Sequence, residues 1–177
     1  MGNMYRPIVV ALVLRMVGLM PSRKGRNPLP QVKTGPASDD AHDVVFFRRH
    51  LADDGAETMP GREFLREVCP PGVRAKFNSI LNAVAAAPPK RFAGGGAWEA
   101  MHGDMTGWFE ARANGPRRRH YRLFCLLDYD ADGLEKPLLV VIDGRDKPFL
   151  TELSEADYAA VRALGDEYRK RNPRSLG

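Results

Sequence analysis

The sequence is poor in the residues that build disulfide scaffolds and metal sites. It contains two cysteines and four histidines among 177 residues, which excludes a disulfide framework and a four-cysteine zinc site. The histidines are scattered along the chain, and none has a cysteine at a metal-binding spacing. We therefore expect neither a metal ion nor any other cofactor.

Long apolar runs are also missing. No uninterrupted stretch reaches the ~18 apolar residues that a membrane-spanning helix needs. The apolar run Ile8–Leu14 ends at Arg15, and no Ala-x-Ala cleavage site follows it, which argues against a secretory signal. We therefore expect that the protein is not secreted and has no membrane partner.

Two ligand-binding motifs begin but are not completed. Gly94–Gly96 lacks the Gly-Lys-Ser/Thr that ends a phosphate-binding loop. The segment from Asp128 to Gly133 matches the first half of an EF-hand calcium loop, but Leu139 stands where that loop needs a glutamate. We interpret the acidic segment as a hairpin turn.

The remaining composition is that of a globular domain with an extension. Apolar residues make up 44% of the chain and charged residues 28%, which suffices for one packed core. Residues 21–40 differ, because they hold four prolines, two glycines and many polar residues, which is typical of a linker. We predict a flexible N-terminal extension over residues 1–42 and one domain over residues 43–177.

Hydrophobic periodicity and turn signals predict an α+β fold for this domain. A strand begins it, two helices follow as a hairpin, four strands form a meander, and a capped helix ends it. The expected elements are residues 44–47, 61–68, 72–87, 98–101, 107–113, 119–127, 137–142 and 154–171. We expect the N-terminal strand and the helical hairpin to pack on a mostly antiparallel sheet of four to five strands, with a C-terminal helix.

The basic residues are concentrated in one place. The net charge is +5, which favours an anionic partner. Five arginines lie within residues 112–122, and Arg112 and Arg122 would lie on adjacent strands of a hairpin. Two interpretations remain open at this point: an ion-paired or solvated rim, or a phosphate clamp whose outer edge is formed by Arg117, Arg118 and Arg119.

A series of short motifs narrows these alternatives. Trp98 is followed by Trp108–Arg112, by His120–Phe124, by Leu139–Pro148 and by the helix after Ser154. In this order and spacing the chain resembles the RelE/HigB toxin superfamily of type II toxin–antitoxin systems, especially its phage-derived Gp49-like branch. The resemblance covers residues 43–171 and implies the RelE-like α+β fold.

The resemblance also implies a function and a set of residues. Members are small cytoplasmic toxins, each neutralised by an antitoxin, and many cleave mRNA on the ribosome without a metal ion. The implied partners are mRNA, the ribosome and a helix-turn-helix antitoxin. The implied catalytic residues are Arg112, Arg122, Arg145, Lys147 and His120, with Arg145 and Lys147 in the loop after the last strand, and the implied RNA-binding residues are Arg117, Arg118 and Arg119.

The proton-transfer groups are less well defined by the resemblance. Cleavage needs an acid and a base as well as cations that stabilise charge on the phosphorane. Some members place a histidine or tyrosine near the end of the last strand, where this chain has Phe149. His120 and Glu110 are the candidates that remain. Two alternative functions stay open, a gyrase-inhibiting ParE-like toxin and a non-catalytic phage-derived nucleic-acid-binding module.

Overall fold

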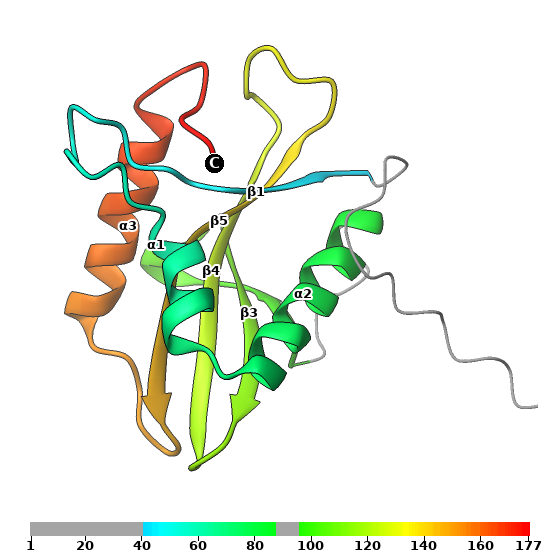
Figure 1. Cartoon of the computed structure of the whole chain (residues 1–177), viewed down its shortest axis with the longest axis vertical. Coiled ribbons are helices and arrows are strands. Elements are labelled where there is room, and N and C mark those ends of the chain that lie inside the picture. Colours follow the sequence, from blue (N-terminus) through cyan, green and yellow to red (C-terminus); the bar gives the residue numbers. More distant parts are fainter. Residues whose placement is uncertain (1–40, 88–95) are drawn as a thin grey trace, which may run out of the picture. The chain divides into compact units, whose positions relative to one another are not determined.

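The computed structural model of the chain describes residues 41–87 and 96–177, which belong to one compact unit (Figure 1). Apart from residues 41 and 42, the predicted extension lies outside the described residues. The elements are β1 (Asp43–Phe46), α1 (Pro60–Glu63), a π-helical turn (Phe64–Val68), α2 (Pro71–Ala86), β2 (Trp98–Ala100), a 3₁₀ turn (Gly103–Met105), β3 (Trp108–Gly115), β4 (Arg119–Asp128), β5 (Leu138–Pro148) and α3 (Glu155–Arg169). The α+β class and the C-terminal helix are confirmed.

The five strands form one mixed sheet in the order β1-β5-β4-β3-β2. The last four strands pair antiparallel, as expected, but β1 runs parallel to β5, so the expectation of a mostly antiparallel sheet is corrected to a mixed sheet at its first strand. Val44 packs into the core on one face of the sheet and Val45 into the core on the other. A strand covered on both faces is typical of parallel pairing.

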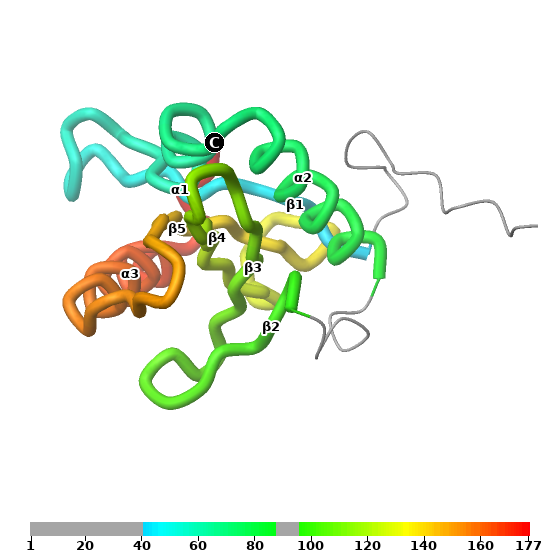
Figure 2. Tube along the Cα trace, turned by 90° about the horizontal axis from the view of Figure 1, so that it is seen from below, coloured from blue at the N-terminus to red at the C-terminus, as the bar shows by residue number. Residues whose placement is uncertain are grey.

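Helices cover both faces of the sheet. α1, the π-helical turn and α2 pack on one face around residues such as Phe77 and Leu123, which are fully buried. α3 packs on the opposite face around Phe124 and Val161, and Figure 2 shows the strands between the two helical layers. None of the helices in the described ranges is long and apolar enough to cross a membrane.

β5 is longer than the expected strand over residues 137–142, because it continues to Pro148. The register with β4 shifts once, and Ile142 is the extra residue on β5 at that point. After this bulge β5 pairs with the whole second half of β4. Arg145 and Lys147 therefore lie inside β5, which corrects the prediction that they belong to the loop after the last strand.

Two glycines mark close approaches between elements. A Cβ atom on Gly144, in the middle of β5, would lie 2.0 Å from Cδ1 of Phe64. A Cβ atom on Gly165, in the middle of α3, would lie 2.3 Å from Cζ2 of Trp108 on β3. In both cases the lack of a side chain lets a helical segment pack directly on the sheet.

Replacing Gly165 with alanine is expected to lower the free energy of unfolding by about 1–3 kcal/mol, the usual cost of overpacking a core. The new methyl group would overlap Trp108, which is only 3% exposed. Alanine also gains ~1 kcal/mol over glycine inside a helix, so the net loss should lie in the lower part of that range. Urea denaturation followed by circular dichroism measures the difference.

The matched control is Gly72→Ala near the start of α2. No atom lies within 4 Å of the Cβ position at Gly72, so this variant should be at least as stable as the wild type. A Gly165→Ala variant that was as stable as Gly72→Ala would contradict the close packing of α3 on β3.

Candidate functional site

Three arginines form a row across three neighbouring strands. Arg112 of β3 lies opposite Arg122 of β4, and Arg122 lies opposite Arg145 of β5. Directly opposite residues of antiparallel strands project from the same face of a sheet. This is the face that carries α3, since Asp157 in the first turn of α3 lies 4.0 Å from Nε of Arg145. We call Arg112, Arg122 and Arg145 the arginine row.

Carboxylates between the arginines offset their mutual repulsion. Glu110, which is 5% exposed, contacts the first two arginines of the row, and its Oε2 lies 3.4 Å from Nε of Arg122. Glu99 on β2 forms a further ion pair with the arginine on β3, and Oδ2 of Asp143 lies 2.7 Å from Nη1 of the arginine on β5. The row is thus both ion-paired, as one interpretation predicted, and held rigidly by the sheet.

Arg122 is the most enclosed member of the row. Its side chain is 13% exposed, whereas those of Arg112 and Arg145 are 32% and 30% exposed. Burial lowers the pKa of Arg122 below its ordinary value, and the Glu110 carboxylate opposes that shift. An arginine nevertheless keeps its proton at physiological pH. The sheet therefore holds a fixed cation in a partly desolvated position, which is the arrangement that stabilises developing negative charge most effectively.

A pocket of about 410 Å³ opens beside two members of the row. It is lined by Lys76, Gly96, Ala97, Arg112, Asn114, His120 and Arg122. Lys76 comes from α2. The sequence alone does not indicate it as a site residue, because a single charged residue on an amphipathic helix is usually a solvated one. The pocket joins cations from a helix and from two strands.

His120 is held in one orientation at the wall of this pocket. Its Nδ1 lies 2.7 Å from Oδ1 of Asn114, and its ring stacks on that of Phe149 with 4.0 Å between the centroids. With Oδ1 of Asn114 assigned as the acceptor of this hydrogen bond, Nδ1 of His120 carries the proton and Nε2 keeps a lone pair. Burial lowers the pKa of His120, and the charges of Arg122 and Lys147 lower it further. His120 is therefore a neutral base at physiological pH.

Tyr158 on α3 is a functional candidate that the sequence analysis missed. It is half-buried, and its ring packs edge-on against Phe124 at a centroid distance of 6.1 Å. Burial raises the pKa of Tyr158, and the Glu110 carboxylate raises it further against the opposing charge of Arg122. The phenol keeps its proton at neutral pH and is a proton donor in the electric field of the arginine row.

The three predicted RNA-binding residues lie outside the pocket and the arginine row. Arg117 and Arg118 lie exposed in the β3–β4 turn, and the carbonyl of Arg118 accepts a hydrogen bond from the Phe149 N–H at 2.9 Å. Arg119 alternates with the row along β4 and forms an ion pair with Asp146, so it belongs to the other face. The turn that carries Arg117 and Arg118 and the chain after β5 lie side by side at one end of the sheet (Figure 1).

Lys147 is the last of the predicted catalytic residues. It pairs in register with His120, but its ammonium group donates to the carbonyl of Thr151. Its charge reaches the imidazole and contributes to lowering the pKa of His120. We therefore place Lys147 beside the site, as a residue that acts on His120.

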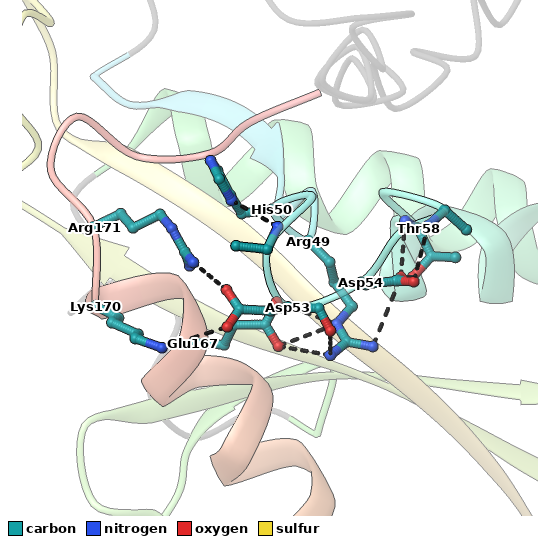
Figure 3. A network of polar contacts seen from close by, with 10 residues as sticks. Arg49, His50, Asp53, Asp54, Thr58, Glu167, Lys170 and Arg171 are labelled. Atoms are coloured by element: carbon teal, nitrogen blue, oxygen red, sulfur yellow. Dashed lines mark hydrogen bonds and ion pairs between the residues drawn. The ribbon is translucent and has the colours of Figure 1, made fainter.

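A second group of charges, shown in Figure 3, fastens the loop after β1 to the C-terminal half of α3. The Nε–H of Arg49 is shared between the two carboxylate oxygens of Glu167, at 3.2 and 3.1 Å, and Nη2 donates to Oε2 of the same residue at 2.9 Å. Asp53 of the same loop pairs with Lys170 and Arg171. These charges are matched to one another, so we assign the group to stability.

Comparisons with protein-family models, curated proteins and solved structures find no match for this chain. Within residues 41–87 and 96–177, no three His, Cys, Asp or Glu side chains come together in a way that could hold a metal ion.

Proposed function

We propose that this protein is a metal-independent endoribonuclease and the toxin of a toxin–antitoxin pair. The observation that carries the proposal is the arginine row with a neutral His120 and a protonated Tyr158 beside it. Cations, a base and an acid are the three kinds of group that RNA cleavage without a metal ion requires. The resemblance to the RelE/HigB superfamily supports the same function and suggests mRNA on the ribosome as the substrate.

Each of these groups has its own role in the proposed reaction. In the proposed reaction Nε2 of His120 removes the proton of a 2′-hydroxyl, and the 2′-oxygen forms a bond to the adjacent phosphorus. Arg112 and Arg122 stabilise the negative charge that builds on the phosphorane oxygens. The bond to the 5′-oxygen then breaks, and Tyr158 gives its proton to the leaving oxygen. The products are a 2′,3′-cyclic phosphate and a 5′-hydroxyl.

The decisive experiment is incubation of the purified protein with mRNA, with and without ribosomes, in the presence of EDTA. Cleavage that leaves cyclic phosphate and 5′-hydroxyl ends is the expected result. Loss of cleavage in EDTA that an added divalent ion restored would contradict the metal-independent mechanism. RNA that is bound but left intact would favour the nucleic-acid-binding module, and inhibition of gyrase without RNA cleavage would favour a ParE-like toxin.

The pH dependence of cleavage follows from His120. Because burial and the neighbouring cations lower the pKa of His120, its base form persists below its ordinary pKa of about 6.5. We expect kcat/KM, which reports the free protein, to rise with pH through a midpoint below 6.5. Lys147→Gln should move that midpoint upward, because it removes one of the charges that lower the pKa. A midpoint unchanged in Lys147→Gln would argue against His120 as the base.

A further inference from the structure

The pocket beside the arginine row extends the site around the edge of β3 to helix α2. Arg112 and Arg122 contribute to it from the strands, and Lys76 contributes from α2. Among the residues that the structure describes, no carboxylate lines the pocket, and the two glutamates that pair with Arg112, Glu99 and Glu110, are not part of the lining. Its volume of about 410 Å³ falls in the range of pockets that hold small organic ligands. The size and the charge together fit an anionic ligand of about one nucleotide.

His120 and Asn114 line the pocket next to Arg122 and Arg112 on the same two strands, and their side chains are suited to a base. Phe149 covers one face of the His120 ring but does not line the pocket, so the imidazole presents a different part of its surface to the cavity. Asn114 accepts the Nδ1 hydrogen bond through Oδ1 and keeps its two amide N–H donors. A flat ring beside an amide is a combination that stacks on a nucleobase and donates to its edge.

We propose that this pocket binds one nucleotide of single-stranded RNA, the one next to the bond that is cleaved. In this arrangement Lys76 pairs with the phosphate that neighbours the scissile one, and His120 and Asn114 lie against the base. A base within a duplex is paired and stacked, so only a single strand can place one here. The substrate class rests on the proposed ribonuclease function, whereas the position of the nucleotide rests on the pocket.

The test uses a fluorescent 2′-O-methyl oligoribonucleotide, which cannot be cleaved because it lacks the attacking hydroxyl. Fluorescence anisotropy gives its affinity between 50 and 200 mM salt for the full-length protein. Each phosphate contact to a single strand contributes about 0.7 to the slope of log K against log salt. Lys76→Gln should therefore reduce the slope by about 0.7.

Arg74→Gln is the matched control, because Arg74 lies on the same helix and does not line the pocket. Its slope should equal that of the wild type. In the wild type, the oligoribonucleotide should also shift the imidazole NMR signals of His120. Equal slopes for the two variants, or His120 signals that stay fixed while the oligoribonucleotide binds, would overturn the pocket assignment.

The two proposals can fail separately. Wild-type protein that binds the oligoribonucleotide through Lys76 but never cleaves natural RNA would disprove the ribonuclease and leave the nucleotide pocket supported. Protein that cleaves natural RNA, with Lys76→Gln and Arg74→Gln binding alike, would overturn the pocket and leave the ribonuclease supported.

Discussion

Replacing Arg122 with alanine is expected to slow RNA cleavage by about 10²–10³-fold, equivalent to 2.7–4 kcal/mol, as for the loss of other donors to a developing oxyanion. Arg122 is the central and most enclosed cation of the arginine row, so its loss removes the charge that the sheet holds most firmly in place. Glu110 would remain paired with Arg112, which limits the damage to the fold. Single-turnover cleavage assays measure the effect on the chemical step.

Arg119→Ala provides the matched control from the same strand. Arg119 projects to the other face of the sheet and pairs with Asp146 at the surface, so its loss should leave cleavage almost unchanged. Arg122→Lys should recover only part of the rate, because an ammonium group cannot reproduce the planar fork of a guanidinium. A folded Arg122→Ala protein that cleaved RNA at the wild-type rate would remove Arg122 from the active site.

The order of the elements could be predicted because each one carries a local signal. The apolar stripe of α2 and the capping box formed by Ser154 and Asp157 predicted two helices that the structure contains. The parallel pairing of β1 could not be predicted. Its apolar residues indicate burial on both faces, but the identity and direction of the neighbouring strand depend on contacts with β5, about 95 residues away along the chain.

The site was predictable only where a hairpin determines it. Arg112 and Arg122 lie opposite each other because a short turn joins their strands. Arg145 joins them because β5 continues past Gly144. This glycine does not form a turn, and its missing side chain leaves room for the ring of Phe64. Lys76 reaches the pocket only through tertiary packing.

The helical spacing of Tyr158 could have identified it from the sequence as a residue that faces the sheet. It begins the helical stripe that packs against the sheet, and the buried members of that stripe are Val161, Gly165 and Tyr168. That spacing shows that its side chain faces the strands. The spacing does not give the position of Tyr158 along the strands, which depends on the packing of α3 against β4 and β5.

A buried ion pair is one of the contacts that hold the C-terminal segment. Nε of Arg174 lies 2.7 Å from Oδ2 of Asp128, and their side chains are 11% and 8% exposed. The Tyr168 hydroxyl donates to the same carboxylate at 2.7 Å, and the Asp130 N–H donates to Oδ1 at 2.9 Å. Burial alone would raise the pKa of Asp128, but the hydrogen bond from Arg174 and the other donors hold it below its ordinary value.

Replacing Arg174 with alanine is therefore expected to lower the free energy of unfolding by about 3–5 kcal/mol at neutral pH, since it leaves a buried carboxylate without its counter-charge. A lowered carboxyl pKa stabilises the fold above the pKa of the unfolded chain, about 3.9, and this contribution disappears as the pH falls through the folded value. The difference between the wild type and the variant should accordingly shrink below about pH 4. Lys170→Ala is the control, because the lysine in its ion pair with Asp53 is 65% exposed and a pair in contact with solvent contributes little to stability. Urea titrations at pH 7 and pH 3.5 measure both variants, and an Arg174→Ala cost as small as that of Lys170→Ala at pH 7 would show that the carboxylate is hydrated after all.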